Sequence, residues 1–376
     1  MSTFFIIAVI VLVFLIIFQI AKASEYVAVL KGEEKARKDN NKVNGFFMIA
    51  FLIAGLIAVY YCNDALYGKT LMVHESASTQ GDEVDHMIWV TLILTGIVFL
   101  ITQILLFWFA YKYQESPKRK AFYFPHNNKL EAIWTIVPTL VLTILIVIGL
   151  RNWFAFTGEA PKNAMEIEVI GKQFNWIFRY PGNDGVFGKK YYKMIDATNS
   201  LGMNWHDSAS IHVTDDPAAH DDIILEQGTV YMVKNKPTKF IIGSRDVVHD
   251  VGLPWFRLKM DAVPGTPTTL WLTPKFTTKE MIEKTGNPNF AYEISCDQIC
   301  GQGHYSMRGV IMVVTQPEFD EWMAKQKPAY YAAYPDKDPA NMKPAVPVAT
   351  DSSKATASVI QAPSKKLLRQ SPSNKF

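Results

Sequence analysis

Sulfur and imidazole side chains gather in one short stretch of this sequence. Cys300 follows Cys296 by four residues. His304 comes four residues after Cys300, and Met307 three residues after His304. Upstream, His249 stands at the end of a predicted strand. Two thiolates, two imidazoles and a thioether form a soft ligand set, which selects copper, zinc or iron–sulfur clusters. The thioether favours copper, because structural zinc sites are built from Cys and His.

The second cysteine sets the number of metal ions that we expect. A single copper ion needs one Cys, two His and a weakly bound Met. A pair of thiolates can bridge two copper ions, which would then share one electron and rearrange little when it arrives or leaves. No ligand position remains open for a substrate, so the site is expected to relay electrons. The alternative is a Cys296–Cys300 disulfide, as in other extracytoplasmic proteins, but His249, His304 and Met307 favour the metal.

The elements that must hold these ligands begin with a membrane half. The 376-residue chain is 49% hydrophobic and only 19% charged, which excludes a fully soluble, a disordered and a collagen-like protein. Four runs contain no Asp, Glu, Lys or Arg, and each has about the 20 residues that a membrane-spanning helix needs. These runs are residues 1–21, 43–63, 86–111 and 132–150. A buried core helix is the alternative for each run, and a cleaved signal peptide is a further alternative for the first. Met1-Ser2-Thr3 contains no basic n-region of a signal peptide, which favours a retained helix.

Loop charges predict the orientation in the membrane. Residues 22–42 carry six basic residues, and residues 112–129 are basic again. Residues 64–85 carry one lysine against five acids. Because basic loops stay in the cytoplasm, we expect both termini and everything after Arg151 on the extracytoplasmic side of a bacterial inner membrane.

The remaining chain predicts a β domain. Short β-rich runs separated by Pro, Gly and Asn turns are typical of a sandwich or small barrel. They cover residues 165–170, 174–180, 238–243, 269–272, 290–295 and 309–314. A short helix is expected over residues 318–325, and a disordered basic tail over residues 327–376. Residues 196–222 hold three histidines and five aspartates beyond Asp196; we interpret them as a solvated loop, with a metal or docking site as the alternative.

Several segments together resemble subunit II of cytochrome c oxidase, the copper-A subunit of the haem–copper oxidases. The resemblance covers about residues 130–314, and its motifs are highly specific. They are Glu131-Ala132-Ile133-Trp134-Thr135-Ile136-Val137-Pro138, Gln173-Phe174-Asn175-Trp176, Asp246-Val247-Val248-His249, Asp261-Ala262-Val263-Pro264-Gly265 and the run from Cys296 to Met307.

The resemblance implies a transmembrane hairpin followed by a cupredoxin-like Greek-key β-barrel. With the two charge-free runs that precede the hairpin, we expect four transmembrane helices before the barrel. The expected parts are an additional N-terminal hairpin (1–63), a subunit II-type hairpin (86–153), a copper domain (160–326) and the tail (327–376). It also implies a dinuclear copper-A centre, bound by the side chains of His249, Cys296, Cys300, His304 and Met307 and by the backbone carbonyl of Gln298. Glu131 matches an acid at the cytoplasmic mouth of a proton path.

The implied activity is that of a cytochrome c oxidase subunit. Electrons would pass from a cytochrome c to haem in subunit I, where dioxygen is reduced to water and protons are pumped. Subunits I and III, the donor cytochrome and the lipid bilayer are the expected partners, and a net charge of +3 gives no sign of nucleic acid. The oxygen chemistry itself would take place in subunit I.

Four features depart from the family pattern. Two helices precede the usual hairpin. Gln298 replaces a glutamate that binds a magnesium ion shared with subunit I, so that ion is in doubt. Phe174 replaces the tryptophan through which electrons often arrive. Phe174 and Trp176, two residues on, are therefore the expected electron-transfer residues, with another donor geometry as the alternative. Arg245 occupies a place that is often acidic, which favours a dedicated or membrane-tethered cytochrome as the donor.

Two other functions remain open. A membrane-anchored copper carrier also uses two cysteines spaced by three residues and a distant histidine, but Met307 and the Asp-Ala-Val-Pro-Gly run disfavour it. A quinol-oxidase subunit that has lost its copper would act as a scaffold, and the complete ligand set disfavours that function.

Overall fold

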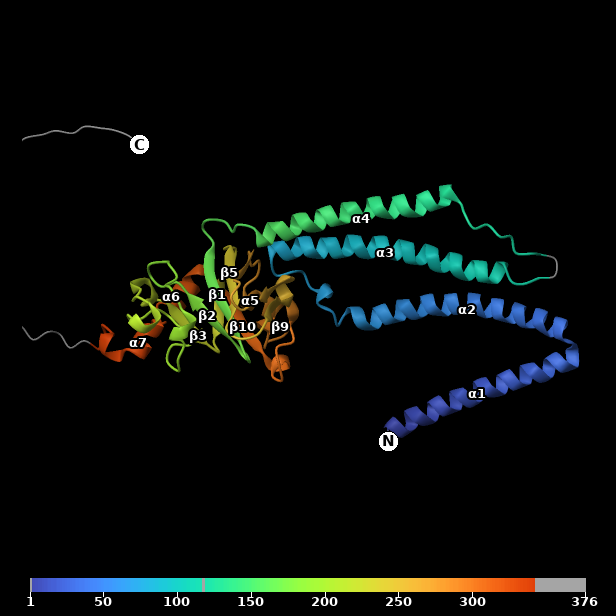
Figure 1. The fold of residues 1–376 in the computed structure, drawn as a ribbon, viewed down its shortest axis with the longest axis horizontal. Coiled ribbons are helices and arrows are strands. Elements are labelled where there is room, and N and C mark those ends of the chain that lie inside the picture. The colour runs from blue at the N-terminus through green and yellow to red at the C-terminus, as the bar shows by residue number, and fades with distance from the viewer. Residues whose placement is uncertain (1, 117–118, 342–376) are drawn as a thin grey trace, which may run out of the picture. The chain divides into compact units, whose positions relative to one another are not determined.

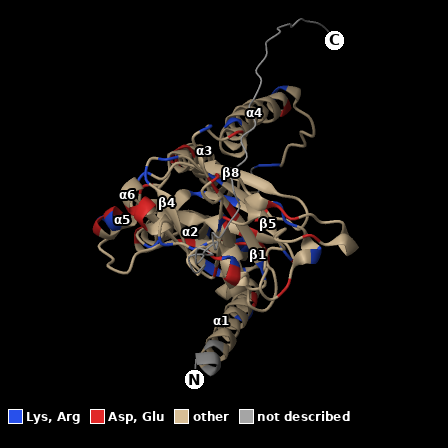
Figure 2. Cartoon of the chain, turned by 90° about the vertical axis from the view of Figure 1, so that its left-hand side faces the viewer, with Lys and Arg blue, Asp and Glu red and all other residues tan. Residues whose placement is uncertain are grey.

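The computed structural model describes residues 2–116 and 119–341. Four long helices open the chain (Figure 1): α1 (Ser2–Lys31), α2 (Glu33–Tyr67), α3 (Thr79–Lys112) and α4 (Asn128–Thr157). By length and composition, all four could cross a membrane. Each contains the described residues of one of the predicted charge-free runs and extends beyond them into polar sequence; Met1 of the first run lies outside the described residues. Figure 2 shows α1 largely without charge, whereas charged residues cover the β domain.

The last two long helices begin with side-chain caps. The Ser78 hydroxyl accepts a hydrogen bond from the Gly81 N–H at the start of α3. At the start of α4, the Asn127 side chain accepts from the Leu130 N–H, and Glu131 Oε1 accepts from the Asn127 N–H at 3.0 Å. These bonds satisfy N–H groups that the first helical turn leaves without partners. Pro138 lies inside α4.

In the part of the chain that the structure describes, ten strands form two five-stranded sheets. One sheet has the order β3-β2-β1-β5-β8 and the other β4-β10-β9-β6-β7. The strands are β1 (Met165–Lys172), β2 (Asn175–Tyr180), β3 (Ile223–Glu226), β4 (Thr229–Val233), β5 (Thr238–Ser244), β6 (His249–Leu253), β7 (Leu258–Ala262), β8 (Thr268–Leu272), β9 (Tyr292–Cys296) and β10 (Arg308–Val314). The two sheets are separate, so the expected cupredoxin-like barrel is closed only loosely. Two pairings are parallel, β1 with β5 and β10 with β4, and the others are antiparallel.

The core lies between the two sheets, because the buried cluster draws side chains from both. Its largest fully buried residues include Trp176, Tyr180, Phe240, Phe256 and Tyr292. Burying such aromatic side chains removes large apolar areas from water and dominates the stability of a core.

Short helices complete the domain. They are α5 (Thr278–Thr285), α6 (Gln316–Met323) and α7 (Ala329–Ala333), with 3-10 helices at Leu71–Val73, Tyr192–Met194, Ala209–Ile211, Pro217–Ala219, Pro254–Phe256, His304–Ser306 and Pro335–Lys337. The helix predicted over residues 318–325 is α6, displaced by two residues. The strand predicted to end at His249 was placed wrongly, because β6 begins at that residue. The helix α5 and the strands β3, β4 and β7 were not predicted.

The first part of the predicted disordered tail is folded. Within it, α7 buries Tyr330, whose ring stacks on His220 with centroids 3.9 Å apart. An apolar side chain with a ring partner can offset the cost of ordering this turn. Residues 334–341 form a separate unit with one 3-10 turn, and residues 342–376 of the predicted tail lie outside the described residues.

The end of the α2–α3 connection and the first turns of α3 are bound to the β domain. We call residues 71–85 the strap. The Ala77 N–H donates to the Trp255 carbonyl at 2.9 Å, and the Lys275 N–H donates to the Ala77 carbonyl at 2.8 Å. Arg257 donates to two strap carbonyls and to Asp85. Lys275 pairs with Glu75 and Asp82. These contacts connect α3 to the domain that follows α4.

Candidate metal centre

Strand pairing brings the two halves of the ligand set together. His249 is the first residue of β6 and Cys296 is the last residue of β9. The two strands are antiparallel neighbours, with Val251 opposite Cys296. The chain then loops from Cys296 back to β10, which pairs with β9 on its other side. The remaining predicted ligands therefore lie on one loop between two neighbouring strands.

All six predicted ligands meet around the two cysteines. Cys296 Sγ lies 3.8 Å from Cys300 Sγ, 3.8 Å from His249 Nδ1 and 3.2 Å from the Gln298 carbonyl oxygen. Cys300 Sγ lies 3.6 Å from His304 Nδ1 and 3.9 Å from Met307 Sδ. His249, Cys296, Cys300 and Met307 are buried, and His304 is half-buried. Each donor atom therefore points into one enclosed space.

The donor set fits a soft metal ion. Two ligands bound at ~2.3 Å in tetrahedral geometry are separated by roughly 3.8 Å, which is the separation of the two sulfur atoms. A disulfide needs a bond of about 2.05 Å, and both thiols are free. Among the described residues, His249, Cys296 and Cys300 are the group of His, Cys and acidic residues with donor atoms all within 4.8 Å of one another.

The electrostatics of the site depend on a bound cation. Burial, with the neighbouring Cys296 thiol, raises the pKa of Cys300 to about 11. A coordinated metal ion reverses this effect, because its charge deprotonates a bound thiol. Burial also raises the pKa of Asp250 to about 7, with a hydrogen bond to Asp261 as a further cause.

Three neighbouring residues contact the imidazole ring of His249. Its Nε2 lies 2.8 Å from Asp246 Oδ1, and its ring meets Trp176 edge to face with centroids 6.0 Å apart. Gly171 on β1 faces the ring so closely that a Cβ there would lie 2.7 Å from His249 Cδ2. These neighbours fix the ring so that Nδ1 faces the sulfur atoms.

Phe174 packs directly on the ligand loop. A Cβ at Gly301 would lie 2.8 Å from Phe174 Cζ, and one at Gly303 would lie 2.5 Å from Phe174 Cγ. The two glycines therefore let an aromatic ring rest on the backbone between Cys300 and His304. The ring keeps 38% of its surface exposed.

The side chains of two predicted site residues, Glu131 and Gln298, lie outside this cluster. Glu131 belongs to the first turn of α4 and caps it. The Gln298 side chain is exposed, and its backbone oxygen alone faces Cys296. An amide binds magnesium more weakly than a carboxylate does, so the residues present do not fit the magnesium site of the family pattern.

The histidines of residues 196–222 are used in local structure. His220 pairs with Asp215 at 2.8 Å and stacks on Tyr330. His212 ends a 3-10 helix in the left-handed conformation. Within the part of the chain that the structure describes, these residues form no His, Cys or acidic cluster of metal-binding size.

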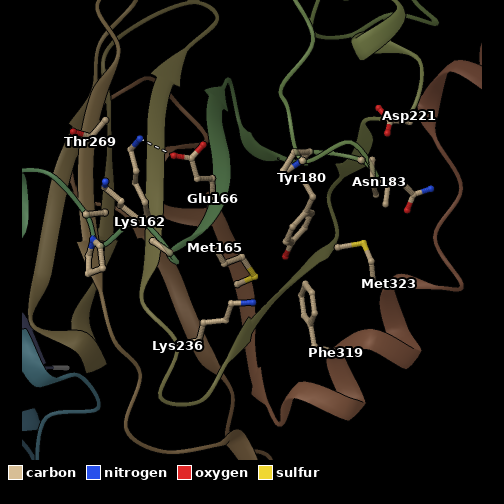
Figure 3. Close-up of a pocket in the computed structure, with 18 of the residues that line it drawn as sticks. Lys162, Met165, Glu166, Tyr180, Asn183, Asp221, Lys236, Thr269, Phe319 and Met323 are labelled. Carbon is tan, nitrogen blue, oxygen red and sulfur yellow. Dashed lines mark hydrogen bonds and ion pairs between the residues drawn. The ribbon is translucent and has the colours of Figure 1, made fainter.

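A cavity of about 1270 Å³ lies elsewhere in the domain (Figure 3). It is lined by the end of α4, the start of β1 and α6, and includes Lys162, Tyr180, Phe319 and the Lys239–Glu166 ion pair at 2.7 Å. None of the predicted metal ligands lines it. This cavity is therefore separate from the cluster of predicted metal ligands.

Sequence reasoning missed the residues that support the ligands. Asp246, Gly171, Gly301 and Gly303 were given no role at the site. An acid three residues before a metal-binding histidine could have signalled a carboxylate that orients the ring. The glycines gave no such signal, because their partners come from other strands.

Comparison with known proteins places this architecture in a family. Residues 67–151 match the family model of the cytochrome c oxidase subunit II transmembrane domain, and residues 165–314 match that of its periplasmic domain. The alternative cytochrome c oxidase subunit 2 of Bradyrhizobium diazoefficiens is 33% identical over 66% of this chain and 82% of that protein. Cytochrome c oxidase subunit 2 of Cereibacter sphaeroides is 24% identical over 68% of this chain and 80% of that protein.

Other relatives match over less of their length. The chain spans 55% of the probable cytochrome c oxidase subunit 2 of Rickettsia conorii, at 26% identity. The crystal structure of the periplasmic domain of subunit II from Bradyrhizobium japonicum matches 44% of this chain and 95% of that domain, at 24% identity and a TM-score of 0.28. With its four apolar helices, its two-sheet domain and its cluster of soft ligands, the chain belongs to the cytochrome c oxidase subunit II family.

Proposed function

We propose that this chain is the electron-input subunit of a respiratory haem–copper oxidase. Its centre would hold two copper ions through His249, Cys296, Cys300, His304 and Met307 and the Gln298 carbonyl. The observation that carries this proposal is the 3.8 Å separation of two buried, unpaired sulfur atoms that are surrounded by two imidazoles and a thioether. When bound, the copper pair supplies reversible one-electron storage.

The protein residues prepare the site for rapid electron transfer. His249, Cys296, Cys300 and Met307 are buried, so water has little access to the donor atoms. All of the donor atoms already face one another, so little movement accompanies binding. A centre that is closed and filled by protein ligands suits relay of electrons and leaves no space for a substrate.

Phe174 is the proposed point of electron input. Its ring is partly exposed and rests on the backbone between Cys300 and His304. An aromatic ring in this position links the surface to the ligand loop without intervening solvent. Trp176 packs against His249 from inside the core and would support the ring of the ligand rather than receive electrons from outside.

The membrane half fits the same role. The family and the four apolar helices make this a bacterial membrane protein of a haem–copper oxidase complex, with subunit I as its partner. We propose that residues 160–326 and both termini lie on the periplasmic side. Subunit III, the donor cytochrome c and a proton-path role for Glu131 belong to the same proposal. The hairpin of residues 1–63 would pack against neighbouring subunits.

A copper carrier is the second candidate, because it also uses two cysteines and a histidine. A carrier must release its ion, and a buried site with five side-chain ligands and a backbone oxygen opposes release. Met307 Sδ lies 3.9 Å from Cys300 Sγ, so the thioether is close enough to be one of these ligands. This favours the relay over the carrier.

The test is Cys296→Ser in the purified complex. We expect loss of the copper pair and of oxygen uptake with the native cytochrome, while the subunit remains in the complex. The matched control is Cys62→Ser, which removes an exposed thiol in α2. Metal analysis and electron paramagnetic resonance (EPR) give the readout. One copper per wild-type chain, with the unpaired electron confined to one nucleus, would favour the carrier and contradict the relay.

A further inference from the structure

We propose that Asp246 is a positioning residue for the copper pair: its carboxylate orients His249 and sets the reduction potential of the centre. This inference rests on the proposed function, because it concerns the metal that the ligand set would hold. It is carried by a chain of contacts that begins at the buried imidazole and ends at the Cys300 carbonyl.

The first contact fixes the histidine. Asp246 Oδ1 lies 2.8 Å from His249 Nε2, and the His249 side chain is fully buried. His249 Nδ1 faces Cys296 Sγ at 3.8 Å. When the Nε2–H group donates a hydrogen bond to the carboxylate, Nδ1 carries no proton and its lone pair is available to a metal. A carboxylate in this place selects the tautomer and makes the imidazole a stronger donor.

Hydrogen bonds hold the carboxylate itself in place. Asp246 Oδ2 accepts from the Gln173 N–H at 2.7 Å, and Oδ1 also accepts from the Val247 N–H at 2.7 Å. The Ser244 hydroxyl accepts from the Asp246 N–H at 3.2 Å. The carboxylate is thus bound from its own turn and from the β1–β2 connection. A side chain held at both oxygens can keep a ring in one orientation.

The last contact reaches the opposite ligand. The Gln173 side-chain amide donates to the Cys300 carbonyl. Gln173 therefore touches Asp246 through its backbone and the cysteine loop through its side chain. Through these two residues, the support of His249 is joined to the support of Cys300. Movement of one ligand would strain the other.

The charge of Asp246 has a separate consequence. Asp246 Oδ1 faces His249 Nε2 at 2.8 Å, and the N–H groups of Gln173 and Val247 donate to its two oxygens, as expected for a carboxylate anion. A fixed negative charge beside the metal stabilises the more positive, oxidised centre. Removal of this charge should therefore make the centre easier to reduce.

The experiment compares four forms of the whole copper-loaded oxidase: wild type, Asp246→Asn, Asp246→Glu and Glu293→Gln. Asp246→Asn keeps an acceptor oxygen for His249 but removes the charge. Asp246→Glu keeps the charge. Glu293→Gln is the matched control, because it removes an exposed carboxylate from the strand that carries Cys296 without touching a ligand. Copper content, the EPR hyperfine pattern and the midpoint potential are measured for each.

The midpoint potential separates the outcomes. For Asp246→Asn we expect two copper ions, an altered hyperfine pattern and a roughly tenfold rise in the reduced-to-oxidised ratio at the wild-type midpoint, which is about 59 mV for one electron. Asp246→Glu should stay closer to wild type, and Glu293→Gln should match it. Copper loss from Asp246→Asn alone would also support a role for the charge.

Two results would overturn the inference. One is an Asp246→Asn centre that holds two copper ions with the wild-type potential and hyperfine pattern. The other is copper loss from both Asp246 variants in an intact complex, which would indicate a packing role. A wild-type complex without a copper pair would instead refute the proposed function, so the two failures are distinguishable.

Discussion

Gly171→Ala tests how tightly the fold holds a ligand that lies far away in the sequence. Gly171 is on β1, and a Cβ at this position would lie 2.7 Å from His249 Cδ2, 2.9 Å from Cγ and 3.1 Å from Cβ. The His249 side chain is fully buried and is held by Asp246 and Trp176. It therefore has no free direction in which to retreat from a new methyl group.

The size of the effect follows from these distances. Non-bonded carbon atoms settle at about 3.5–4.0 Å, so the imidazole would have to move by roughly 1 Å. Metal–ligand distances tolerate only about 0.2 Å. We expect copper affinity to fall by at least about tenfold, with overpacking that costs about 1–3 kcal/mol of folding free energy.

The assay is copper retention by the purified complex during titration with a chelator. Gly243→Ala is the control, because Gly243 lies on the neighbouring strand β5 and its Cβ would meet only the flexible end of Ile170 at 3.1 Å. Copper retention should be close to wild type in that variant. Equal retention in Gly171→Ala and Gly243→Ala would refute the view that β1 fixes the imidazole.

Three further predictions concern other parts of the chain. Phe174→Ala should slow electron input from the donor on the order of tenfold without loss of copper, as measured by stopped-flow reduction; an unchanged rate would exclude the ring from the route. Glu131→Ala should slow turnover at saturating donor and leave the copper content unchanged, whereas wild-type turnover would contradict a proton-path role. Burial raises the pKa of Asp222 from 3.8 to about 6. The folded state then holds the extra proton between these values, so this group's contribution to stability falls as the pH rises through that window. Asp222→Asn should remove that slope from thermal unfolding measured between pH 4 and 7, and an unchanged slope would assign it to other groups.

The helices could be predicted because a membrane imposes a simple rule. A span needs about 20 residues without charge, and the described residues of each predicted run lie inside one long helix. The ends of the helices were harder to predict, because caps such as Ser78 and Asn127 lie in polar sequence beyond the apolar run. Helix ends depend on these local bonds rather than on hydrophobicity.

The missed strands have a polar character that tertiary contacts explain. β6 begins with His249 and Asp250, both buried, and β7 contains Lys259 and Asp261. Such residues are depleted in strands on average. They occur here because β6 carries a ligand to the centre and pairs with β7 on one side and β9 on the other.

That Cys296, Cys300, His304 and Met307 lie close together could be predicted from their spacing, because they stand on one loop. The contacts that hold these ligands in place could not be predicted from spacing. Asp246 and Gly171 act on His249 from another turn and another strand, and that relation exists only once β1 and β5 pair with Gly171 opposite Ser244. The spacing of residues along the chain can indicate which side chains bind a metal. The residues that surround and position those side chains are known only once the chain has folded.

The strap limits how the β domain can pivot. A domain that hangs from a single linker can swing, but this one is pinned twice, by the connection after α4 and by residues 71–85. Ser76, Ala77 and Ser78 are completely buried in that second attachment. Because electron tunnelling weakens steeply with separation, such a double anchorage would keep the gap between the ligand loop and an acceptor in the membrane constant from one turnover to the next.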